Sequence, residues 1–163
     1  MNKKLPNINT SLGFSLIELL VVVGILILVV GGGIASFISF NEKQQVVNGA
    51  KELQEYLRTA QTLIRVGQKP DGCGTLNAYR VVSSDSGTTK EIKVIAVCSS
   101  DDIDRNSFFL PEGTTLSSDI SITFLGLHGG VSGATTIEVV GGNDRTYTFE
   151  VTQGGEITQG GFL

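Results

Sequence analysis

GFSLIELLVVVGILILVV, residues 13–30, is the stretch that decides the fold of this chain. From residue 14 to residue 34 its only charged side chain is Glu18. The helical residues 14–30 would reach about 25 Å at ~1.5 Å per residue, which is short of a bilayer core of about 30 Å. A membrane helix must therefore continue through Gly31–Gly33. Because the residues up to Phe40 are apolar or small, the sequence predicts one transmembrane helix over residues 14–40.

The residues before this stretch indicate its orientation. Lys3 and Lys4 lie in a short polar segment without acids, and lysines beside an apolar span hold that end in the cytoplasm. We therefore expect a single-pass protein of the cytoplasmic membrane whose C-terminal domain lies outside the cytoplasm. The alternative is a signal peptide with Gly33-Ile34-Ala35 as its small-residue cleavage site, which would release a secreted β-domain.

Glu18 counts against an ordinary signal peptide. A carboxylate within an apolar span costs about 2.5–3.5 kcal/mol on insertion scales. No Lys, Arg or His lies in the span to pair with it. The counter-charge for Glu18 must therefore come from elsewhere.

The residues around Glu18 resemble a known motif. Gly13-Phe14-Ser15-Leu16-Ile17-Glu18-Leu19-Leu20 is similar to the cleavage and methylation motif of prepilins, the precursors of type IV pilins and of the pseudopilins of type II secretion. The resemblance implies that a membrane prepilin peptidase removes residues 1–13 as a leader and N-methylates the new amine of Phe14. The implied fold is α+β and pilin-like, a long N-terminal helix, half of it transmembrane, packed on a C-terminal antiparallel β-sheet domain.

Cleavage after Gly13 would give Glu18 a partner. The α-amine of Phe14 on one subunit can meet the Glu18 carboxylate of a neighbour, so that two charges that are costly in lipid neutralise one another. Desolvated ion pairs contribute little net stability but fix register, and Glu18 is therefore predicted to be a filament-assembly residue. Many family members carry a helix-kinking proline where this chain has Gly31–Gly33. Each of these glycines destabilises a helix by about 1 kcal/mol relative to alanine. Either they bend or melt the helix here, or they let neighbouring helices approach closely.

Beyond residue 40 the helical pattern becomes amphipathic. Six apolar residues recur at steps of four and three and form one stripe: Val46, Ala50, Leu53, Leu57, Ala60 and Ile64. Gly67 followed by Pro70 is a stop signal. The sequence predicts one helix over Phe14–Val66, with residues 41–68 as its amphipathic continuation packed against the protein's own sheet.

Residues 71–163 change to a period of two, which is typical of β-strands. Four groups of apolar residues alternate with other residues: Ile92, Val94 and Ala96; Ile120, Ile122 and Phe124; Ile137 and Val139; and Tyr147, Phe149 and Val151. Glycine-rich turns separate these groups. The pattern predicts an extracytoplasmic β-sheet domain, an antiparallel sheet with one buried face.

The two cysteines are placed by the predicted hairpin. If Thr75–Val82 pairs with Lys90–Val97 about a turn between Asp85 and Ser86, facing residues have numbers that sum to 171, and Cys73 and Cys98 fulfil this condition. They would be cross-strand neighbours about 5 Å apart, within reach of a disulfide. A disulfide fits a location outside the cytoplasm. Two free buried thiols are the alternative.

Neither an enzyme nor a cofactor or metal site is predicted. His128, the single histidine, lies in a glycine-rich turn without a paired base. Asp102, Asp104 and Asn106 have the alternate spacing of calcium ligands, but Ser107 stands where such a loop needs glycine. Residues 71–163 hold 5 basic and 12 acidic side chains, a balance that argues against nucleic acid as a partner.

The last strands resemble one group within the family. ITFLGLHGGVSGATTIEVV and RTYTFEVTQGGEI are similar to the sheet of the H-type minor pseudopilins and related minor pilins. This implies a minor pseudopilin of a type II protein secretion system, with prepilin peptidase, other pilin or pseudopilin subunits and the inner membrane as partners. The alternative is a minor pilin of a type IV pilus. A version for DNA uptake would need a basic stripe on the sheet domain.

Overall fold

The computed structural model describes residues 13–87, 89–126 and 130–163, with the backbone alone for residues 32–35. The predicted leader, apart from Gly13, and His128 therefore lie outside the described residues. The chain divides into two compact units, of which the first ends at Ser39 and the second is Phe40–Leu163. Helix α1, Leu16–Arg65, contributes residues to both units.

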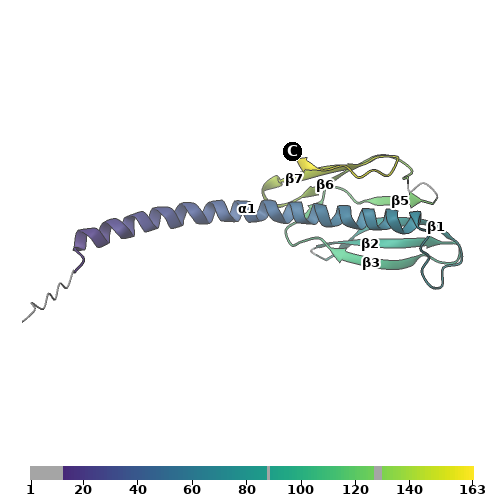
Figure 1. Cartoon of the computed structure of the whole chain (residues 1–163), viewed down its shortest axis with the longest axis horizontal. Coiled ribbons are helices and arrows are strands. Elements are labelled where there is room, and N and C mark those ends of the chain that lie inside the picture. The colour runs from purple at the N-terminus through teal and green to yellow at the C-terminus, as the bar shows by residue number, and fades with distance from the viewer. Residues whose placement is uncertain (1–12, 88, 127–129) are drawn as a thin grey trace, which may run out of the picture. The chain divides into compact units, whose positions relative to one another are not determined.

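Helix α1 runs through Gly31–Gly33 as helix and ends where the sequence predicted (Figure 1). Gly67 has φ +64, a left-handed conformation that glycine adopts without a steric penalty. The Gly67 N–H donates to the Ile64 carbonyl (3.1 Å), and the Gln68 N–H donates to the Leu63 carbonyl (2.9 Å). These two bonds form a Schellman motif, which satisfies carbonyls that the end of the helix leaves free.

The strands form two four-stranded antiparallel sheets. The first has the order β3-β2-β1-β5, built from β1 (Leu76–Ser86), β2 (Thr89–Cys98), β3 (Ile103–Phe109) and β5 (Ser121–Leu125). The second has the order β4-β6-β7-β8, built from β4 (Thr115–Leu116), β6 (Thr135–Val140), β7 (Thr146–Val151) and β8 (Gly161–Phe162). A 3-10 turn, Gly142–Asp144, lies between β6 and β7.

The prediction of a single sheet was therefore wrong. Strand β5 returns to pair with β1 at the edge of the first sheet, whereas β4, which precedes β5 in the chain, pairs with β6 of the second sheet. An isolated bridge pairs Phe124 of β5 with Val131, which lies before β6.

The core of the unit Phe40–Leu163 is formed by α1 and both sheets. The predicted stripe of α1 is confirmed, because each of its six residues is at most 5% exposed. The inward strand residues are also buried as predicted: Ile92, Val94, Ala96, Ile120, Ile122, Phe124, Ile137, Val139, Phe149 and Val151. Tyr147 differs, since it is only half-buried and packs edge-on against Phe162 with ring centroids 5.4 Å apart.

The β1–β2 hairpin has a different register from the predicted one. Ser86 pairs with Thr89, so most facing residues have numbers that sum to 175 instead of 171. The turn lies at Gly87 (φ +66) and not between Asp85 and Ser86, because short hairpin loops need positive φ. The displacement is four residues, an even number, and each side chain therefore keeps its predicted face.

Cys73 and Cys98 form the predicted disulfide, with Cα atoms 5.5 Å apart. They do not face each other across two strands, however. Cys98 ends β2 opposite Leu76, and Cys73 lies before β1 begins. A turn at Gly72 (φ +83) precedes Cys73, which reaches Cys98 from the loop after α1.

Side chains of α1 and β1 fix neighbouring segments through main-chain carbonyls. The Gln54 Nε2 donates to the Thr158 carbonyl (3.2 Å), and the Gln61 Nε2 donates to the Gly155 carbonyl (2.7 Å). The buried Tyr79 donates its hydroxyl to the Gln68 carbonyl (2.8 Å) just after the helix end. Burial raises the pKa of Tyr79, although nearby Arg105 lowers it in part, so the hydroxyl keeps the proton that this bond requires.

Candidate functional site

The candidate site is the start of helix α1 with the two residues of the predicted cleavage bond. Gly13 and Phe14 precede the helix in non-helical backbone and are exposed, Phe14 to 82%. Exposed, non-helical backbone near a chain end is where proteolysis concentrates. The predicted bond Gly13–Phe14 therefore lies in an accessible position.

Ser15 caps the helix, and Glu18 lies in its first turn. The Glu18 N–H donates to the Ser15 Oγ (3.2 Å), and the Leu19 N–H donates to the Ser15 carbonyl (3.2 Å). Serine followed by glutamate three residues later has the spacing of a capping box. A carboxylate at this place is also favoured by the partial positive charge of the helix N-terminus. The sequence reasoning missed this role of Ser15, although the spacing Ser-x-x-Glu carries the signal.

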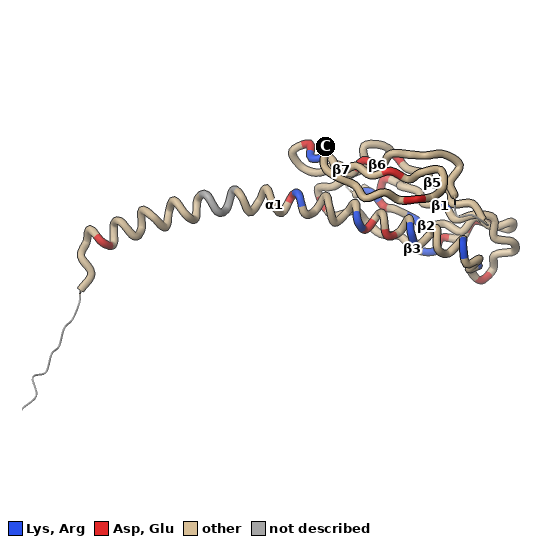
Figure 2. Tube along the Cα trace, turned by 45° about the horizontal axis from the view of Figure 1, so that its top comes forward, with Lys and Arg blue, Asp and Glu red and all other residues tan. Residues whose placement is uncertain are grey.

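The apolar half of α1 is exposed throughout its described side chains. Every residue of 13–31 and 36–40 is exposed. This half of the helix is almost entirely tan in Figure 2, the colour of residues other than Lys, Arg, Asp and Glu. Length and composition make α1 one candidate membrane span, with a mean hydropathy of 2.7 over its best 18-residue window. Such a surface fits lipid or other apolar helices rather than water.

The acidic residues that resembled calcium ligands are engaged with cations. The Asp102 carboxylate lies 3.7 Å from the Arg80 guanidinium, and the Asp104 carboxylate lies 3.9 Å from the Lys93 amine. Among the described residues, no group of three or more His, Cys, Asp and Glu side chains is placed to hold a metal ion.

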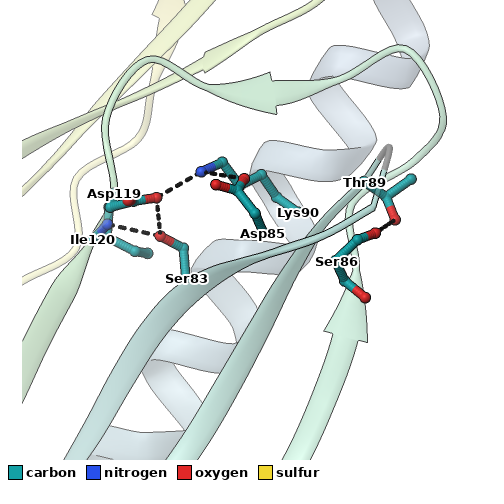
Figure 3. A network of polar contacts seen from close by, with 7 residues as sticks. All are labelled: Ser83, Asp85, Ser86, Thr89, Lys90, Asp119 and Ile120. Carbon is teal, nitrogen blue, oxygen red and sulfur yellow. Dashed lines mark hydrogen bonds and ion pairs between the residues drawn. The ribbon is translucent and has the colours of Figure 1, made fainter.

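A network of polar contacts lies at the tip of the β1–β2 hairpin (Figure 3). The Lys90 amine lies 2.6 Å from Asp119 and 2.8 Å from Asp85. Ser83 donates its hydroxyl to Asp119 (3.2 Å) and accepts from the Ile120 N–H (2.9 Å). Hydrogen bonds to Asp119 and then Asp85 raise the pKa of Lys90, and the bond to Lys90 lowers the pKa of Asp119. This network ties the hairpin to the loop before β5.

No protein-family model, no curated protein and no solved structure matches this chain.

Proposed function

We propose that this chain is a pilin-like structural subunit, a minor pseudopilin of a type II protein secretion system. Prepilin peptidase cleaves it after Gly13 and methylates Phe14, and the mature chain leaves the cytoplasmic membrane to join a filament with its sheet domain outside the cytoplasm. The observation that carries the proposal is the position of Glu18. It lies five residues after Gly13 and is the lone charge of an exposed apolar segment.

The division of α1 into two halves supports the proposal. Residues 14–31 and 36–40 are exposed, whereas the six apolar residues of the stripe from Val46 to Ile64 are buried in the core. A subunit that is stored in a membrane and later packed by its helix needs an apolar surface on the first half. The Cys73–Cys98 disulfide supports folding outside the cytoplasm, because cytosolic thiols are kept reduced.

Charge pairing supplies the assembly chemistry. Removal of the leader creates a positive amine on Phe14, and that amine pairs with the Glu18 carboxylate of a neighbouring subunit. Each charge alone is costly among apolar helices, so a subunit placed at the wrong axial offset leaves both unpaired. The pair therefore selects the offset between neighbours more than it adds net stability.

The spacing of a capping box offers a second explanation of Glu18, in which the residue only closes the first helical turn. Glu18→Gln separates the two explanations, because glutamine serves in a capping box as well as glutamate does but carries no charge. We expect normal processing and at least about a tenfold loss of incorporation into filaments, since an unpartnered buried charge costs about 3–5 kcal/mol. Ser15→Ala is the matched control, because it weakens the cap and keeps the charge. Normal incorporation of Glu18→Gln would refute the assembly role.

The cleavage site is tested by the intact mass of the chain co-produced with a prepilin peptidase. We expect a mature chain that begins at N-methylated Phe14. A chain that begins at Ser36 would identify a secreted β-domain released by signal peptidase, and an uncleaved chain would likewise contradict the proposal.

A further inference from the structure

Three exposed cations recur along the second half of α1. Lys51, Arg58 and Arg65 are exposed, and blue positions recur along this part of the helix in Figure 2. Within the described part of the chain, none of the three lies within 4.0 Å of a carboxylate. A step of seven residues returns to nearly the same side of a helix, with a drift of about 20°. The three cations therefore form a line with a spacing of about 10.5 Å, which we call the basic line.

Two hollows lie between the basic line and the segment 154–160. The first, of ≈ 660 Å³, is lined by Lys51 and Arg58, and the second, of ≈ 460 Å³, is lined by Arg58 and Arg65. Each hollow also contains one carboxylate, that of Glu55 in the first and that of Glu156 in the second. Each hollow thus has two cations and one anion in its lining, and it attracts a further carboxylate.

The far wall of both hollows is held in place by side chains of α1. Gln54 lines the first hollow and donates to the Thr158 carbonyl (3.2 Å). Gln61 lines the second hollow and donates to the Gly155 carbonyl (2.7 Å). The shape of the hollows is therefore set before a partner arrives. A surface that is already ordered loses little conformational entropy on binding.

The spacing of the basic line indicates a helical partner. Each hollow is bounded by two consecutive cations of the line, so carboxylates that enter both hollows would lie about 10.5 Å apart. Side chains on one side of a helix recur at this distance when they are seven residues apart. On one side of a strand they recur at about 6.6 Å, which does not match. Ion pairs that recur at heptad positions between neighbouring helices set partner choice and orientation.

This chain does not carry the matching helix itself. Among the described residues α1 is the one α-helix, and its carboxylates are those of Glu18, Glu42, Glu52 and Glu55. No two of them are seven residues apart. A second copy of the chain therefore cannot fill both hollows in this way, and the occupant must be a different protein. This fits a minor subunit, whose neighbours in a filament are other subunits.

We propose that the basic line binds an α-helix of a different filament subunit, one that presents carboxylates seven residues apart, with one carboxylate entering each hollow. The inference rests on the proposed filament function and names the kind of neighbour that this subunit accepts. Because exposed ion pairs contribute little energy each, the contact selects and orients the neighbour, while the apolar helices supply most of the association.

An NMR titration of the full chain in a non-ionic detergent tests the contact. The chain is labelled with nitrogen-15, and the shift of the Arg65 Nε–H signal measures the dissociation constant of a synthetic helical peptide. The peptide carries glutamate at one position of each of three heptads. A control peptide of the same composition carries its glutamates five residues apart, so that they point to different sides of the helix. We expect the heptad peptide to bind about fivefold more tightly than the control peptide, the upper range for one exposed ion pair.

Two substitutions should change the dissociation constant in opposite directions. Arg58→Gln removes the cation that both hollows share and should weaken binding of the heptad peptide about fivefold. Glu156→Gln removes a carboxylate that repels the peptide and should strengthen binding by about two- to fivefold. Arg105→Gln is the matched control, since Arg105 is an exposed cation of β3 outside the hollows, and it should leave the dissociation constant unchanged.

Equal affinity for the two peptides, no effect of Arg58→Gln, or weaker binding by Glu156→Gln would overturn the proposal. So would displacement of the peptide by phosphatidylglycerol in the micelles, because the basic line would then serve an anionic lipid surface. A shift of the Arg65 signal on addition of unlabelled chain would identify a second copy as the occupant and would equally contradict it. The titration requires neither cleavage nor assembly, and all variants keep Gly13 and Glu18. Failure of the contact is thereby distinguished from failure of the proposed function, which normal incorporation of Glu18→Gln would reveal.

Discussion

Reduction of the Cys73–Cys98 disulfide should destabilise the unit Phe40–Leu163 by about 3.5 kcal/mol. The two cysteines are separated by 25 residues in the sequence. Closing a loop of that length removes about 12 cal/mol/K of entropy from the unfolded chain, which is about 3.5 kcal/mol at 25 °C. Native contacts enter this estimate only weakly, because the cross-link acts mainly on the unfolded state.

The expected change in Tm follows from the size of the unit. About 120 residues that each gain about 2.1 cal/mol/K on unfolding give an unfolding entropy of about 0.25 kcal/mol/K. A loss of about 3.5 kcal/mol then lowers Tm by about 14 °C.

Thermal melting of the full chain in detergent, followed by tyrosine fluorescence, measures this shift because Tyr79 lies in the core at 0% exposure. Reduction of the native chain changes the bond and leaves every side chain in place. The double variant Cys73→Ser, Cys98→Ser should melt near the reduced protein and should not respond to reductant. If the reduced protein melts within about 3 °C of the oxidised one, the cross-link does not stabilise the unit in the way loop entropy predicts.

Two further variants test the network of Lys90 and the helix stripe. Lys90→Met should lower Tm by a constant amount between about pH 5 and pH 10. At high pH the deficit in Tm should shrink above the ordinary Lys pKa of 10.5, as the pH rises through the raised pKa of Lys90. At low pH it should shrink below the ordinary Asp pKa of 3.8, as the pH falls through the lowered pKa of Asp119. Melting across pH tests this, and a deficit that persists at both extremes would contradict it. Leu57 is 0% exposed, and Leu57→Ala should lower the free energy of unfolding, measured by chemical denaturation, by about 2–5 kcal/mol. The control Glu52→Ala, at an exposed position of the same helix, should change it by less than about 0.5 kcal/mol. Similar losses in the two variants would show that the stripe is not the buried face.

Sequence periodicity predicted the buried face of the helix and of the strands, with Tyr147 as an exception. The stripe from Val46 to Ile64 and the alternation of Ile92, Val94 and Ala96 depend only on the helical and strand repeats, and burial follows from which face is apolar. The end of α1 was equally predictable, because Gly67 is suited to the left-handed conformation.

Features that depend on a choice between competing turns were not predictable in the same way. Asp85-Ser86 and the following Gly87 are all acceptable turn residues, and the paired structure places the turn at Gly87. Because the predicted turn was displaced, the predicted register placed Cys73 opposite Cys98 on a strand. In the structure Cys73 reaches Cys98 from a loop. The number of sheets depends on β5 pairing with β1, a contact between residues far apart in sequence. Ser15 is a different case, because its capping role could be predicted from the spacing Ser-x-x-Glu.

The hydrogen bonds of the Gln54 and Gln61 amides bear on which amino acids the segment beside α1, around Gly155 and Thr158, can carry. They donate to the carbonyl oxygens of Thr158 and Gly155, and every amino acid carries that atom. The path of this segment is thus recognised without regard to many of its side chains. Different residues can be displayed there, for a different neighbour, while the two glutamines keep this segment anchored in the same place.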